Sequence, residues 1–108
     1  MNVAEKYRKL LEERKKQIEI DFDQESIIKE MIEVLTTNIG ETIKFLKYEC
    51  TSEEFVWLSE IFREIVEICS SKEFVDELYK LAEKYPEETE EYNVMSFIDE
   101  AAGYLEED

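Results

Sequence analysis

The chain has 108 residues, enough for one domain, and its 44% hydrophobic content can build a core without disulfides or a structural metal. Acidic residues number 29 against 13 basic ones, which gives a net charge of −16, and histidine is absent. A field of this sign repels nucleic acid and anionic membranes and attracts basic proteins, so we expect neither nucleic acid nor a membrane among the partners.

The first predicted helix spans residues 3–20. Its charge is mixed, because residues 1–20 hold six basic and four acidic side chains, whereas the rest of the chain holds seven and 25. Its apolar stripe consists of Val3, Tyr7, Leu10, Leu11 and Ile18. The stripe is narrow, which is typical of a helix that packs at the edge of a domain.

Two further helices are predicted before residue 50. Asp23 or Ser26 can cap a helix that runs to Asn38, and a third helix spans residues 41–48. Asn38 and Gly40 are expected to end the second helix, because both residue types tolerate the left-handed conformation.

The clearest helix start lies at Thr51. Thr51 and Glu54 have the spacing of a capping box, and an apolar run follows directly. We expect one continuous helix from residue 52 to 69. Its buried side would consist of Phe55, Leu58, Ile61, Phe62, Ile65, Val66, Ile68 and Cys69. Ser70 and Glu73 repeat the capping-box spacing and predict another helix over residues 72–85.

Pro86 ends that helix and can begin a short helical turn over residues 87–91. Asn93 is a good N-cap for the last helix, residues 94–105, whose core side would carry Phe97, Ile98, Ala101 and Leu105. The chain has only two glycines and one proline, which favours helices over sheets. The sequence therefore predicts an all-α fold, a compact bundle of five to six short helices forming a single domain over residues 1–108.

The two cysteines indicate a reducing environment. Cys50 and Cys69 lie 19 residues apart, with no CxxC motif and no histidine to complete a zinc site. Both fall on apolar faces, so we expect buried free thiols and a cytoplasmic protein. Met1 is followed directly by a charged amphipathic stretch, and no apolar run approaches the roughly 20 residues that a membrane span requires, so we expect neither a signal peptide nor a transmembrane helix.

No motif for catalysis is found. A Ser or Cys nucleophile needs a nearby base, usually histidine, and no Gly-rich loop for phosphate is present. Asp21, Asp23 and Glu25 alternate as calcium ligands do. However, Ser26 and Ile32 stand where an EF-hand loop has Gly and Glu. We therefore expect no enzyme activity, no metal and no cofactor.

The predicted helix over residues 52–69 carries an acidic stripe. At about 100° per residue, four carboxylates fall within about 60° of one another, opposite the core residues. They are Glu53, Glu60, Glu64 and Glu67. Trp57 lies at the border of the stripe, and a partly exposed Trp beside carboxylates is typical of an interface anchor. A solvated helix face with Trp57 at the edge of the core is the competing interpretation.

A second acidic zone surrounds Pro86, with Tyr85 and Tyr92 as flanking aromatic residues. Its carboxylates are Glu83, Glu87, Glu88, Glu90 and Glu91. Such a segment can present acceptors and aromatic surface together to a partner. The competing interpretation is a flexible connector, because loops of this composition are often mobile.

The run TSEEFVWLSEIFREIVEICSSKEFVDEL, followed by AEKYPEETEEYNVMSFIDEAAGYL, resembles the small helical immunity proteins of bacterial contact-dependent growth inhibition and related polymorphic toxin systems. The upstream run TTNIGETIKFLKYEC fits the same family. The resemblance covers about the last two-thirds of the chain, best over residues 51–105, and does not include the first 35 residues. It consists of caps and core positions, so it assigns no functional residue.

The resemblance implies a protein that binds a cognate toxin domain and blocks its active site or substrate surface. Many such toxins are nucleases with basic surfaces, and an acidic inhibitor would present carboxylates where phosphates bind. Two alternatives stay open. One is an acidic nucleic-acid mimic that inhibits a DNA-binding protein, which requires parallel rows of carboxylates. The other is a helical adaptor whose acidity serves only solubility and whose contact surface is apolar, for example around Tyr7, Leu10 and Leu11.

Overall fold

The computed structural model describes residues 2–17 and 24–105. This part of the chain is all-α, as predicted, and contains no strand. Its helices are α1 (Val3–Gln17), α2 (Gln24–Thr37), α3 (Ile39–Tyr48), α4 (Ser52–Leu58), α5 (Phe62–Cys69), α6 (Lys72–Lys84), α7 (Pro86–Glu91) and α8 (Val94–Ala102), with a 3-10 turn, η1 (Ser59–Ile61), between α4 and α5. The predicted core position Ile18, the cap at Asp23 and the alternation that begins at Asp21 lie outside the described residues.

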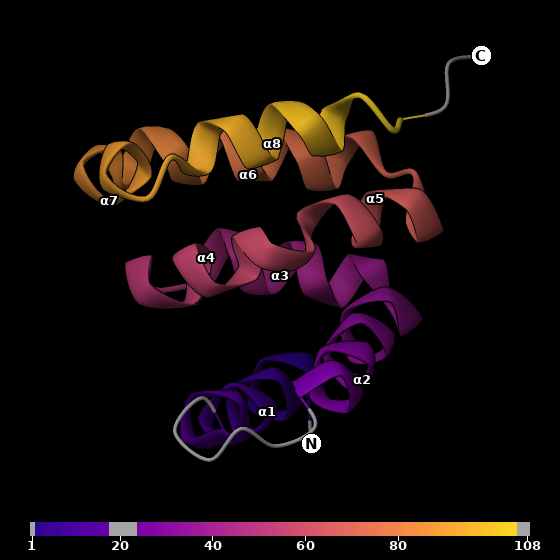
Figure 1. Cartoon of the computed structure of the whole chain (residues 1–108). Helices are drawn as coiled ribbons and strands as arrows, with labels where there is room; N and C mark the ends of the chain where they lie inside the picture. Colours follow the sequence, from indigo (N-terminus) through magenta and orange to yellow (C-terminus); the bar gives the residue numbers. More distant parts are fainter. Residues whose placement is uncertain (1, 18–23, 106–108) are drawn as a thin grey trace.

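The helices are arranged in three tiers (Figure 1). α6, α7 and α8 form one outer tier, α3, α4 and α5 lie in the middle, and α1 and α2 form the opposite tier. Contacts between α5 and α8 and between α3 and α6 join the outer tier of α6–α8 to the middle tier. Contacts between α2 and α5 join the middle tier to the tier of α1 and α2. No helix in the described ranges is both long and apolar enough to cross a bilayer.

The core runs through all three tiers and is rich in aromatic rings. Tyr7, Phe45, Phe55, Phe62 and Phe74 are almost completely buried. The rings of Phe55 and Phe62 are 5.8 Å apart between centroids, as are those of Tyr7 and Phe45. Such contacts place large apolar area at the centre of a small chain, which holds the short helices together.

The capping box at Thr51 is confirmed. The Thr51 hydroxyl accepts a hydrogen bond from the Glu54 backbone N–H at 3.2 Å, and a Glu54 carboxylate oxygen accepts one from the Thr51 N–H at 3.0 Å. The two bonds satisfy backbone donors at the start of α4. They therefore fix where α4 begins.

The prediction of one continuous helix over residues 52–69 is wrong at its middle, where η1 separates α4 from α5. The Ser59 hydroxyl donates to the Val56 carbonyl at 2.5 Å, and Ile61 leaves the helical region with φ −122° and ψ 10°. A serine that bonds to a preceding carbonyl competes with the regular helix ladder. One helical wheel therefore does not describe both halves. Ile68, predicted to be buried, is 61% exposed.

Two other predicted caps are wrong in detail. Ser71, not Ser70, caps α6 and accepts from the Phe74 N–H at 3.1 Å, while Ser70 ends α5 in the left-handed region with φ 45°. Asn38 does not end α2 in a left-handed conformation. Instead it caps α3, accepting from the Glu41 N–H at 3.2 Å, and Gly40 lies inside α3 without a positive φ.

The last helix differs from its prediction at both ends. Asn93 precedes α8, but it has a left-handed φ of 54° and makes no side-chain cap bond, and α8 ends at Ala102 instead of Leu105. Phe97 was expected in the core and is 41% exposed, whereas Ile98 and Ala101 are fully buried. Fewer residues of α8 are therefore buried than its apolar sequence suggests.

Candidate protein-binding groove

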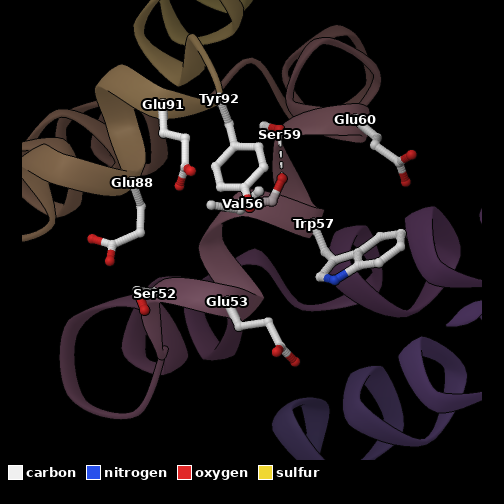
Figure 2. A pocket seen from close by; sticks show the side chains of 9 residues that line it. All are labelled: Ser52, Glu53, Val56, Trp57, Ser59, Glu60, Glu88, Glu91 and Tyr92. Atoms are coloured by element: carbon white, nitrogen blue, oxygen red, sulfur yellow. Dashed lines mark hydrogen bonds between the residues drawn. The ribbon is translucent and has the colours of Figure 1, made fainter.

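A groove of about 620 Å³ opens between α4–η1 and α7 (Figure 2). Four carboxylates, those of Glu53, Glu60, Glu88 and Glu91, and two aromatic residues, Trp57 and Tyr92, line it. Ser52, Val56 and Ser59 complete the lining. Figure 2 shows the acidic side chains of α7 on one side of the Tyr92 ring and Trp57 on the other.

The groove brings together residues from both acidic zones of the sequence. Glu53, Trp57 and Glu60 come from the predicted stripe, and Glu88, Glu91 and Tyr92 come from the zone around Pro86. Six other candidate residues do not line it: Glu64, Glu67, Glu83, Tyr85, Glu87 and Glu90. Tyr85 is half-buried, and its hydroxyl donates to the Cys50 carbonyl at 2.9 Å, so its polar end serves the fold.

The carboxylates of the predicted stripe are paired with cations of the same chain. Glu53 pairs with Lys15, and Glu60 accepts from Arg14 at 2.8 Å. Glu64 and Glu67 both pair with Arg63, at 3.4 and 3.2 Å. Arg14 and Lys15 of α1 therefore lie against the acidic α4–η1 segment.

The carboxylates of α7 differ from those of the stripe in their ion pairing. In the described parts of the chain, no cation forms an ion pair with Glu87, Glu88, Glu90 or Glu91. Pro86 occupies the first position of α7, as predicted, and the Tyr92 N–H donates to the Glu88 carbonyl at 3.0 Å. This bond sets Tyr92, 54% exposed, at the end of the same acidic helix. The uncompensated negative charge of the groove is therefore on its α7 side.

Trp57 and Tyr92 contribute unequal surfaces. The guanidinium carbon of Arg14 lies 5.5 Å from the centroid of the Trp57 ring, so α1 covers part of the indole. Tyr92 projects from the end of α7 toward Val56 and Ser59 (Figure 2). Of the two aromatic residues, Tyr92 offers the more open ring to a partner.

A partly buried ionic network fixes α1 against the start of α4. Arg8 donates to the Glu54 carboxylate at 2.6 Å and to the Glu49 carbonyl at 3.1 Å. Burial raises the pKa of the Glu54 carboxyl, but hydrogen bonds from Arg8 and Thr51 outweigh it, so the pKa lies below its ordinary value. The bond to Glu54 in turn raises the pKa of Arg8. This network holds the helix that forms one wall of the groove.

The two thiols are free, and they differ in exposure. Cys50 is 4% exposed, and burial raises its pKa to about 12. Cys69 is half-buried rather than buried as predicted, and burial raises its pKa as well. No group of three or more Cys, Asp or Glu side chains within residues 2–17 and 24–105 is arranged to hold a metal ion.

No family model, curated protein or solved structure matches this chain. Its own fold and groove define it as a small all-α protein with an acidic, aromatic concave surface. Sequence reasoning missed Ser52, Val56 and Ser59 as parts of this surface, and Arg14 as the buried cation that pairs with Glu60 beside it. The basic excess of residues 1–20 was the available signal for Arg14, since cations in so acidic a chain find carboxylates nearby.

Proposed function

We propose that this protein is an immunity protein, which binds a basic bacterial toxin domain and neutralises it by covering the substrate surface of that domain. The contact surface is the groove, with the carboxylates of Glu88 and Glu91 along its α7 side. Trp57 and Tyr92 supply apolar area, and the carboxylates supply charge. The protein acts as an inhibitor by occupying space and needs no chemistry of its own.

The observation that carries this proposal is the unpaired state of Glu88 and Glu91 beside the exposed ring of Tyr92. Carboxylates already held by internal cations, such as Glu53 and Glu60, can accept a partner only by sharing or breaking those pairs. Within residues 2–17 and 24–105, Glu88 and Glu91 have no such competitor. They are therefore the groove carboxylates best suited to a basic partner.

The same charges act before contact. A net charge of −16 attracts a basic domain over distances set by ionic strength and raises association above the roughly 10⁵–10⁶ M⁻¹s⁻¹ of uncharged pairs. After contact, an aromatic side chain in a water-excluding rim supplies most of the binding energy. Fast capture suits an inhibitor that must stop a toxin before it acts.

Two competing functions receive less support. A duplex mimic needs rows of available carboxylates, but Glu53, Glu60 and Glu67 are each paired with a cation. The adaptor hypothesis relied on an apolar surface in α1. That surface is absent, because Tyr7 and Leu11 are buried within the core, at 0% and 3% exposure.

The test is to mix this protein with the basic toxin domain encoded beside it and to measure both binding and toxin activity. We expect a one-to-one complex, loss of toxin activity, and an affinity that falls steeply between about 50 and about 300 mM salt. A toxin that stays fully active with excess protein, or an affinity indifferent to salt, would refute the proposal.

A further inference from the structure

All three arginines of the chain have one kind of environment. Each guanidinium lies over an aromatic ring and donates to a carboxylate. The guanidinium carbons of Arg8, Arg14 and Arg63 lie 5.4, 5.5 and 5.8 Å from the ring centroids of Phe45, Trp57 and Tyr104, respectively. The carboxylates that accept from these three arginines are those of Glu54, Glu60 and Glu100, in the same order. Among the described lysines, only Lys84 lies over a ring, that of Tyr85.

The α7 side of the groove holds the same components, and none of the described residues supplies a cation to it. Tyr92 supplies an exposed ring, and Glu88 and Glu91 supply carboxylates three residues apart, on one face of α7. Figure 2 shows the three side chains around one opening. The ring and carboxylates that hold each arginine of this chain are therefore also present here for an arginine of another protein.

We propose that the groove binds an arginine side chain of the partner, with the guanidinium over the Tyr92 ring and its N–H groups donating to Glu88 and Glu91. This inference rests on the proposed function and names the group that the site selects. The aliphatic part of the arginine would lie along Val56, which lines the same groove.

Arginine fits this arrangement better than lysine for three physical reasons. Its planar guanidinium stacks on a ring, its donors form a fork that reaches two acceptors at once, and it is more weakly hydrated than an ammonium group. A lysine ammonium would gain the same Coulomb attraction but not the stacking or the two-acceptor geometry. The groove should therefore discriminate between two partners of equal charge.

The test uses two capped peptides of equal charge, hexa-arginine and hexa-lysine. Trp57 is the only tryptophan of the chain and lines the groove, so its fluorescence reports occupancy. We expect hexa-arginine to bind about tenfold more tightly than hexa-lysine at the same ionic strength. The ratio of the two affinities is the measurement, because overall charge attraction contributes equally to both.

α7 provides a matched control. The double variant E88Q/E91Q should reduce the arginine-to-lysine affinity ratio to about one. The double variant E87Q/E90Q has the same net charge, in the same helix, but changes carboxylates that do not line the groove, and it should keep the ratio. Tyr92→Phe retains the ring and should keep most of the preference, whereas Tyr92→Leu should lose most of it.

An affinity ratio of one in the unchanged protein would overturn this inference, as would an equal effect of the two double variants. Neither result contradicts the proposed function, since a basic toxin can be captured by charge alone. Conversely, failure to inhibit the toxin domain refutes the proposed function whatever the peptides do. Thermal melting of each variant, expected to be unchanged at these exposed or half-exposed positions, separates loss of binding from loss of folding.

Discussion

Arg14 of α1 lies over the indole ring of Trp57 in α4 and donates to the Glu60 carboxylate at 2.8 Å. Arg14 is only 8% exposed, so this charged side chain is part of the packing between the first helix and the groove. A cation held in this way contributes through its hydrogen bonds and through the contact of its aliphatic part with the ring. It also makes the position of Trp57 dependent on α1.

Replacing Arg14 with Met should therefore destabilise the protein by roughly 1–3 kcal/mol, because a charge-assisted hydrogen bond within a packed contact is lost. Urea unfolding measures this free energy, and Trp57 emission should shift as the indole loses its covering group. Lys16→Met is the control, since it removes the same charge from an exposed position of α1. Equal losses in the two variants would contradict the structural role of Arg14.

Acid should destabilise the protein partly through Glu54. The pKa of Glu54 is lower in the folded protein than its ordinary value of 4.5, so the unfolded chain binds this proton more readily. The stabilisation is complete above the unfolded pKa and is lost as pH falls through the folded pKa. Glu54→Gln should flatten the fall in unfolding free energy below about pH 5, and Glu13→Gln, at an exposed position of α1, controls for the removal of one carboxylate. An unaltered slope in Glu54→Gln would argue against the network.

The two thiols should react at very different rates. Cys50 is buried with a pKa of about 12, so thiolate is scarce at neutral pH and the sulfur is inaccessible. Cys69 is half-buried and more accessible to a reagent. We expect the variant Cys50→Ser to be labelled readily, through Cys69, and the variant Cys69→Ser to be labelled slowly until the protein unfolds. Similar labelling rates in the two native variants would refute this assignment.

Neighbouring apolar residues of α8 should differ sharply in their contribution to stability. Ile98 is fully buried, and Ile98→Ala should cost about 2–5 kcal/mol through lost contacts and the cavity left behind. Phe97 is 41% exposed, and Phe97→Ala should cost less than about 1 kcal/mol. Denaturant unfolding distinguishes the two. A larger loss at Phe97 would restore the sequence-based assignment of that residue to the core.

Local signals predicted much of the fold. The capping box of Thr51 and Glu54 and the start of α7 at Pro86 depend on residues within one turn, so they are readable from the sequence. The break at Ser59 is not, because a serine in an apolar-periodic run is also compatible with a regular helix. The assignment of Ile68 and Phe97 to the core is wrong. Helical periodicity indicates which residues can be buried, but it does not indicate which faces of a helix pack against another helix.

The candidate site was predictable in composition but not in its charge balance. Glu53 and Glu88 come from separate acidic zones, and only the tertiary fold brings them into one groove. The pairing of Glu60 with Arg14 spans 46 residues, a separation at which sequence spacing carries no information. In the sequence, the acidic stripe over residues 52–69 and the segment around Pro86 are equivalent acidic clusters. The structure distinguishes them, because cations of the same chain pair with the carboxylates of the stripe.

The brevity of α7 has a consequence for dynamics. Its six residues include four glutamates, some of which lie three or four positions apart. Each such pair of like charges weakens an isolated helix by a few tenths of a kcal/mol. Thr89 is the only buried residue of α7. Its backbone amides should exchange with solvent faster than those of α5, whose Phe62, Ile65 and Val66 are fully buried. Cations brought by a ligand would relieve the repulsion and slow that exchange. Recognition would then be coupled to ordering of the helix that carries Glu88 and Glu91.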